Sequence, residues 1–311
     1  MIRQLIRARP LVWAWVLVTA FLPLSGPLSA HEIQAGAKPG TWSQTPFADG
    51  RSVFSFDGWE GAAIPVYSYV PTGVDKTTAP IMVMMHGAKR GAKRYLEEWI
   101  PYAQREGFIV IAPLFAKDNF PTSRQYNLGW IREKGAVQMH PEEMWSFSAI
   151  EPLFDAARAT LGSKRESYTL YGHSAGSQFI HRFLFLKPDA RVSRFLPANA
   201  GWYTFPDIDR DYPYGLGGIG VNEQQLRAAL AKDVVILLGD QDIDTDHESL
   251  RRTKQAMRQG NHRFARGVNF FRAGRDLAKE KGWDFGWTVR VIKGVAHQNG
   301  GIARWSNDLV E

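Results

Sequence analysis

Short apolar runs alternate with longer mixed stretches along most of the chain. Six of the runs are nearly continuous, as expected for strands buried on both faces: 79–87, 108–114, 167–172, 194–200, 233–239 and 287–294. Four intervening stretches have the spacing or polarity of helices: 92–106, 142–161, 175–187 and 247–281. This alternation predicts an α/β fold with a mostly parallel central sheet and helices on both faces.

Two further features complete the predicted layout. Residues 52–56 and 64–70 are two strand-like segments separated by a Gly-containing turn, which predicts an antiparallel hairpin before the parallel strands. Residues 115–141 and 201–222 exceed the usual length of a connection and are rich in aromatic residues, glycine and proline. Their aromatic content favours ordered coverings with a functional role.

The first thirty residues differ from the rest. Three arginines precede the apolar stretch 11–22, and small residues lead to Ala30, as in a cleavable secretory signal. The apolar stretch is shorter than the roughly 20 residues needed to span a bilayer, so an uncleaved anchor is the weaker alternative. We therefore expect a signal peptide at 1–30, a single domain at 31–311, and a periplasmic or extracellular protein without a stable membrane anchor once the signal is cleaved.

Composition narrows the possible functions. The chain has 311 residues and no cysteine, so its fold depends on the packed core and not on disulfides. The formal charge is +7, of which three charges belong to the predicted signal. Without dense clusters of lysine and arginine, this excess does not favour nucleic acid as a partner.

The segment "YGHSAGSQF" carries the strongest chemical motif. Gly172, Ser174 and Gly176 form a G-x-S-x-G pattern between a predicted buried strand and a predicted helix. In that context the pattern indicates a nucleophile elbow, in which the serine occupies a strained turn and small residues allow neighbouring backbone to pass closely.

A serine nucleophile needs a histidine base and an acid that orients it. In the architecture that a nucleophile elbow indicates, the chain order is serine, acid, histidine. His247, His262 and His297 follow Ser174. His297 comes directly after the last predicted strand, where a loop at the carboxyl edge of the sheet would hold it. His247 and His262 fall within the predicted polar helix, so His297 is favoured.

The chain resembles the α/β-hydrolase superfamily. The resemblance rests on "HGAKRG", "GHSAG", "GDQD" and "GVAH", each placed after a predicted strand, and it covers residues 50 to 308. "HSAGSQFIHRF" and "ANAGWYTFP" are similar, more narrowly, to exported bacterial esterases of the polyhydroxybutyrate-depolymerase and feruloyl-esterase type. The resemblance implies a secreted serine hydrolase that cleaves carboxylic esters through an acyl-enzyme and uses no cofactor.

The same resemblance implies roles around the serine. His86 and Gly87 would shape the loop beside the nucleophile, and the amides of Ala88 and Ala175 would receive the oxyanion. Two pre-aimed backbone donors stabilise a tetrahedral intermediate, whatever the family. His86 itself is expected to hold the turn, and His173 to pack beside the elbow.

The acid must come from "GDQDIDTD", which has aspartates at 240, 242, 244 and 246. Alternate aspartates also occur in calcium loops, but Thr245 and Arg251 stand where such a loop needs glycine and glutamate. The resemblance places the acid at Asp242, with Asp240 as the alternative. Asp244 and Asp246 would solvate the turn or cap the following helix.

Aromatic residues near the predicted strand ends are candidates for the substrate pocket. Trp130, Trp202 and Tyr203 would suit an apolar or aromatic ester, although each of them could equally pack in the core. We therefore expect a small-molecule or oligomeric ester as the substrate. A peptidase of the same fold and a catalytically silent binding module are the alternatives, and the oligomeric state is left open.

Overall fold

The computed structural model describes residues 42 to 311, which lie within one compact unit, Gly40–Glu311. Its strands form one eight-stranded sheet in the order β1-β2-β4-β3-β5-β6-β7-β8. β1 and β2 pair antiparallel, β2 and β4 also pair antiparallel, and the remaining neighbours are parallel. The strands are β1 Gly50–Phe56, β2 Ile64–Val70, β3 Ile81–Met85, β4 Ile109–Pro113, β5 Tyr168–His173, β6 Val192–Ala198, β7 Val234–Gly239 and β8 Trp287–Ile292.

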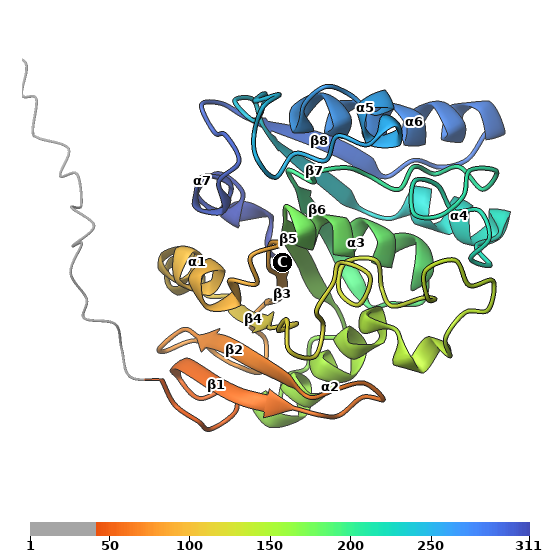
Figure 1. The fold of residues 1–311 in the computed structure, drawn as a ribbon. Helices are drawn as coiled ribbons and strands as arrows, with labels where there is room; N and C mark the ends of the chain where they lie inside the picture. The colour runs from red at the N-terminus through yellow and green to blue at the C-terminus, as the bar shows by residue number, and fades with distance from the viewer. Residues whose placement is uncertain (1–41) are drawn as a thin grey trace, which may run out of the picture. The chain divides into compact units, whose positions relative to one another are not determined.

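Helices cover both faces of this sheet (Figure 1). One hydrophobic cluster joins the sheet to helices α2, α3, α4 and α6, and a second joins it to α1 and α7. The helices are α1 Ala92–Glu106, α2 Ile150–Leu161, α3 Ala175–Leu186, α4 Glu223–Ala231, α5 Lys254–Arg258, α6 Arg263–Lys281 and α7 Asn299–Arg304, with 3-10 turns η1 Glu142–Met144, η2 Ser146–Ala149 and η3 Asn307–Leu309. The predicted α/β-hydrolase arrangement, with its antiparallel hairpin at one edge, is therefore confirmed.

The predicted helix over 247–281 is wrong in its first part. Residues 247–253 are irregular, and two helices follow in place of one. The Thr253 side chain caps α5 by accepting from the Ala256 amide, and the His262 side chain caps α6 by accepting from the Ala265 amide. Each cap satisfies an amide that the helix itself cannot bond, so the chain starts a new helix at each position.

Two other helical predictions need adjustment. The stretch 142–161 begins with 3-10 turns and becomes α-helical only at Ile150. Helix α4 was not expected, although its capping box is visible in the sequence. The Asn222 side chain accepts from the Gln225 amide while the Gln225 side chain accepts from the Asn222 amide.

The two long connections contain no helix or named strand, as predicted. Each contributes side chains to the core, which anchors it over the sheet and the helices: Phe120, Tyr126 and Ile131 from the first, and Leu216 and Ile219 from the second. The predicted signal at 1–30 lies outside the described residues. Within residues 42 to 311, no helix has the length and hydropathy required of a membrane span.

Candidate active site

Ser174 lies at the sharp turn between β5 and α3. Its backbone has φ 59° and ψ −114°, a conformation that residues with a side chain rarely adopt. A Cβ atom on Gly172 would overlap the backbone of Gly176, and one on Gly176 would overlap the carbonyl of Met85. Both glycines are therefore required by the close passage of backbone around the serine.

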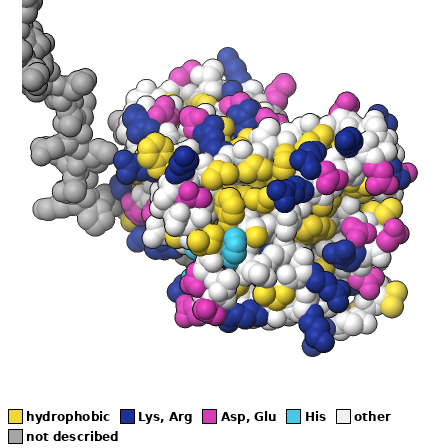
Figure 2. Space-filling model, turned by 90° about the horizontal axis from the view of Figure 1, so that it is seen from above, with side chains coloured by type: hydrophobic (Ala, Val, Ile, Leu, Met, Phe, Trp, Pro, Cys, Tyr) yellow, Lys and Arg dark blue, Asp and Glu magenta, His cyan; other side chains and the backbone are white. Residues whose placement is uncertain are grey.

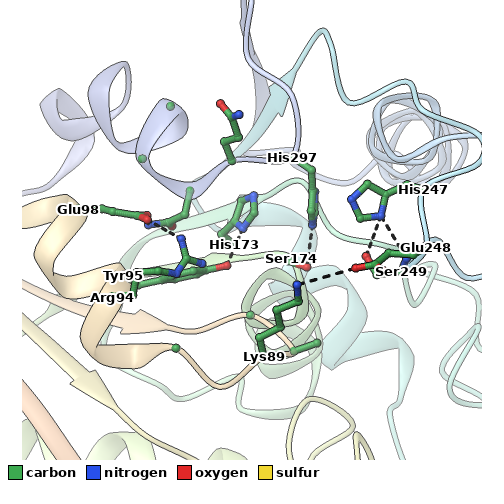
Figure 3. Close-up of a pocket in the computed structure, with 17 residues that line it drawn as sticks. Lys89, Arg94, Tyr95, Glu98, His173, Ser174, His247, Glu248, Ser249 and His297 are labelled. Atoms are coloured by element: carbon green, nitrogen blue, oxygen red, sulfur yellow. Dashed lines mark hydrogen bonds and ion pairs between the residues drawn. The ribbon is translucent and has the colours of Figure 1, made fainter.

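Three predicted residues from distant parts of the chain meet at this turn. His297 Nε2 lies 3.0 Å from Ser174 Oγ (Figure 3), and His297 Nδ1 lies 2.7 Å from Asp242 Oδ2. A carboxylate only accepts, so Nδ1 carries the imidazole proton and the Nε2 lone pair faces the hydroxyl. The arrangement can remove the proton from Ser174 and hold the resulting imidazolium.

The four aspartates of the loop after β7 have different surroundings. Asp242 is 2% exposed, whereas Asp244 and Asp246 are exposed. Asp240 accepts from the Gly294 amide at 2.8 Å and so ties the loop after β7 to the loop after β8. Asp244 accepts from the Asp246 amide within the turn, and neither residue caps a helix, because Thr253 caps α5.

Asn199, which sequence reasoning missed, joins the two loops that carry the acid and the histidine. It is fully buried at the end of β6. Its side chain accepts from the Gly239 amide at 2.9 Å and donates to the Ala296 carbonyl at 3.1 Å. In the sequence, the segment "ANAG" contributes only to the family likeness, because nothing there indicates which backbone groups the Asn199 side chain contacts.

Arg263 is a second residue that was missed. Its side chain is 1% exposed, and Nη1 donates to Asp242 Oδ1 at 3.2 Å. Nη2 donates to Ser249 Oγ at 2.9 Å and to His247 Nδ1 at 3.2 Å. The two Asp242 oxygens are therefore held by different partners, one of them a buried cation. The sequence predicts one polar helix over 247–281, and that pattern does not indicate that Arg263 is buried.

The charge on His297 is governed by its surroundings. Burial lowers its pKa from the ordinary value of 6.5, the Asp242 carboxylate opposes that shift, and the Arg263 and His247 side chains add to it. A lowered pKa leaves the imidazole neutral at pH 7, which is the form a general base requires.

The loop after β3 lies against the serine. His86 is buried, accepts from the Phe115 amide at Nε2 (3.1 Å) and reaches the Gly87 carbonyl with Nδ1 (3.0 Å). Burial lowers the pKa of His86 to about 3, so it remains neutral. It thus links the loop after β3 to the chain after β4. Ala88 lines the cleft with Gly87, and Ala175 is the first residue of α3.

His173 and Tyr95 form a buried pair behind the nucleophile. Tyr95 Oη lies 2.9 Å from His173 Nδ1, and the His173 ring is 4.7 Å from that of His297 (Figure 3). Burial lowers the pKa of His173 well below 6.5, so the ring packs as a neutral group. This placement agrees with the packing position expected for His173.

A cleft of about 490 Å³ opens beside Ser174. Polar and charged side chains dominate its wall: Lys89, Arg94, Glu98, His247, Glu248 and Ser249. Arg94 pairs with Glu98 at 2.5 Å, and Lys89 approaches Glu248 at 3.9 Å, both at the rim drawn in Figure 3. The face seen in Figure 2 likewise mixes lysine, arginine and acidic side chains with a band of hydrophobic ones.

The three aromatic pocket candidates are corrected by this geometry, because none of them lines the cleft. Trp130 stacks on His140 at a centroid distance of 4.7 Å. Tyr203 is fully buried and stacks on Phe270, so it belongs to the core. Trp202 is 5% exposed and packs against arginine side chains.

The remaining histidines lie apart from one another in residues 42 to 311. His247 lies at the cleft and His262 caps α6. Among residues 42 to 311, no three histidine, aspartate or glutamate side chains are grouped as metal ligands would be.

Solved structures supply the comparison. The chain is 45% identical to the poly(aspartic acid) hydrolase-1 of Sphingomonas sp. KT-1, with a TM-score of 0.82 over 84% of this chain and 98% of that one. It is 32% identical to LpqC, the poly(3-hydroxybutyrate) depolymerase of Bordetella parapertussis, with a TM-score of 0.79 over 84% and 89% of the two chains. No family model and no curated protein sequence matches.

The chain belongs to the α/β-hydrolase superfamily. The S-formylglutathione hydrolase of Agrobacterium tumefaciens has the same fold at 17% identity, with a TM-score of 0.53 over 84% of this chain and 94% of that one. Hydrolase activity of the serine type follows from the two closer relatives and from the turn that places Ser174 in the lining of the cleft. The expected likeness to bacterial depolymerases and esterases is confirmed.

Proposed function

We propose that this serine hydrolase cleaves carboxylic esters through an acyl-enzyme. Ser174 Oγ attacks the carbonyl carbon while its proton passes to His297 Nε2, and His297 then gives that proton to the leaving alcohol. Water hydrolyses the acyl-enzyme by the same route and restores Ser174. The continuous hydrogen bonds from Asp242 through His297 to Ser174 carry this proposal.

The amides of Ala88 and Ala175 are the proposed oxyanion donors. Neither amide donates a hydrogen bond to an acceptor within residues 42 to 311. Ala175 begins α3, whose N-terminal amides have no acceptor inside the helix, and the helix field there favours developing negative charge. Gly87 brings the other donor close, because a Cβ placed on it would lie 3.7 Å from Ser174 Cβ.

The test is covalent labelling with a fluorophosphonate, combined with turnover of p-nitrophenyl butyrate. We expect one label, on Ser174, and no label on Ser174→Ala. Equal ester turnover by the folded wild type and the folded Ser174→Ala variant would refute the proposal and favour the catalytically silent binding module.

Amide hydrolysis in an acidic polymer is the second candidate. The relative at 45% identity is described as a poly(aspartic acid) hydrolase, and Lys89 and Arg94 line the cleft of this chain. Arg94 is paired with Glu98, whereas Lys89 is exposed and only approaches Glu248 at 3.9 Å, so Lys89 is the cation that suits an anionic substrate. Initial rates on poly(aspartic acid), 3-hydroxybutyrate oligomers and p-nitrophenyl butyrate would separate the candidates. A higher kcat/KM on poly(aspartic acid) than on both esters would establish the amide reaction.

We further propose that the protein is exported and cleaved near Ala30, on the pattern of basic, apolar and small residues at 1–30. N-terminal sequencing of protein recovered outside the cytoplasm tests this. An intact Met1 in that fraction would contradict cleavage.

A further inference from the structure

A second cleft, of about 340 Å³, lies where the two long connections meet. The first connection contributes residues 123–124, 128 and 131–135, the second contributes residues 212–214, and Arg251 comes from the irregular segment before α5. Four cationic side chains line it, with a single acidic one, Glu133: Arg124, Arg132, Lys134 and Arg251.

None of these four cations is neutralised within residues 42 to 311, where no carboxylate lies within 4.0 Å of any of them. The Glu133 carboxylate lies 3.8 Å from His140 instead. Several other arginines are paired with carboxylates; Arg191, for example, contacts both Glu151 and Asp155. Four like charges around one concavity repel each other and raise the local concentration of anions.

The position of Arg251 is fixed by its neighbours. Its guanidinium lies 4.8 Å from the Trp202 ring centroid, and its Nε donates to Tyr214 Oη at 2.8 Å. Arg182, which is fully buried, lies 4.4 Å from the same Trp202 ring. A guanidinium held by stacking loses less freedom when it binds a carboxylate. Trp202, which the sequence placed in the substrate pocket, instead holds the Arg251 guanidinium by stacking.

A short stretch of chain links the second cleft to the catalytic one. Residues 247–249 line the cleft at Ser174, and Arg251 lines the second cleft. Since successive Cα atoms are about 3.8 Å apart, the Cα atoms of Ser249 and Arg251 are separated by at most about 7.6 Å. An extended oligomer gains about 3.4 Å per residue, so a short one reaches both clefts.

We propose that the second cleft is a subsite for the carboxylates of an acidic oligomer, which it holds while another part of the same molecule occupies the cleft at Ser174. The proposal rests on the proposed function only in that the ligand is a substrate segment; either an ester or an amide bond can be the one cleaved. Uncharged esters gain nothing from the subsite.

The test is binding of fluorescein-labelled deca-aspartate to Ser174→Ala, followed by anisotropy. Arg124→Gln/Lys134→Gln removes two charges from the subsite without breaking any hydrogen bond or ion pair of these side chains among the described residues. Arg272→Gln/Lys279→Gln, on the exposed side of α6, is the matched control. We expect the subsite double variant to raise the Kd about tenfold, equivalent to about 1.4 kcal/mol, and the control to change it less than about twofold.

Equal losses of deca-aspartate affinity in the two double variants would show that only the overall charge matters and would overturn the proposal. An absence of deca-aspartate binding would also overturn it. Turnover of p-nitrophenyl butyrate by the double variants with Ser174 intact separates this proposal from the proposed function. Both double variants should retain the full wild-type turnover of this ester. If wild type and Ser174→Ala turn over the ester equally, the proposed function fails, whatever the anisotropy shows.

Discussion

The two clefts of this hydrolase are built in different ways. At Ser174, the proposed catalytic side chains stand within five residues of the ends of β5, β7 and β8, and hydrogen bonds join them to one another and to Arg263. In the second cleft, the cations stand mainly on long connections and have no acidic partner among the described residues. Proton transfer requires fixed distances, which short loops anchored at strand ends provide, whereas charge attraction acts over several ångströms and is compatible with longer connections.

The largest contrast between the clefts should come from Ser174→Ala. Removing the nucleophile should lower kcat for p-nitrophenyl butyrate by at least about 10⁴-fold, because no other group can form the acyl-enzyme. The variant should keep the thermal unfolding midpoint of the wild type, measured by circular dichroism. A decrease smaller than tenfold would show that Ser174 is not the nucleophile.

A slightly smaller loss is expected for Asp242→Asn. The amide cannot hold His297 in the tautomer that accepts the serine proton, so kcat should decrease by about 10³ to 10⁴-fold. Asp240→Asn is the matched control, because Asp240 accepts only from the Gly294 amide and from its neighbour Gln241. The control should lose less than about tenfold. The reverse ranking would move the acid to Asp240.

Arg263→Gln should alter the pH profile as well as the rate. Losing the cation beside Asp242 removes a cause that lowers the pKa of His297. That pKa should therefore rise, leaving more imidazolium at a given pH, and the acidic limb of kcat/KM should move to higher pH. In the wild type the limb should lie below pH 6.5, since burial lowers the His297 pKa.

The charged and titratable groups that contact or face His297 are Asp242, Arg263, His247 and His173. His247→Asn therefore serves as a comparison for Arg263→Gln, with a smaller shift in the same direction. Arg263→Lys should restore the limb partly, because it keeps the charge but loses the second contact. Loss of thermal stability in Arg263→Gln without any movement of the limb would assign Arg263 a purely structural role.

The smallest effect is expected for Arg251→Gln. It removes one carboxylate contact from the second cleft, so KM for an acidic oligomer should rise about threefold while kcat changes little. KM for p-nitrophenyl butyrate should stay constant. A similar change in KM for both substrates would connect Arg251 to the catalytic cleft and not to the second one.

The sequence by itself determined the sheet, the turn at Ser174 and the histidine that lies beside it. A continuous apolar strand is buried on both faces, which places it between two layers of helices. Glycines two residues before and two residues after a serine at the end of such a strand indicate a turn in which a Cβ at either glycine would overlap backbone. Chain order then left His297 as the favoured partner, because loops after parallel strands meet at one edge.

The tertiary structure alone decided which charges are buried and where each aromatic side chain packs. Asp242 and Asp244 are two residues apart in a polar run, yet only Asp242 is buried, where it meets His297 and Arg263. Trp202 follows β6 as a pocket residue would, but contacts Arg182 and Arg251. Local patterns report propensity and periodicity, whereas burial and pairing depend on residues far away in the chain, which only the packed fold brings together.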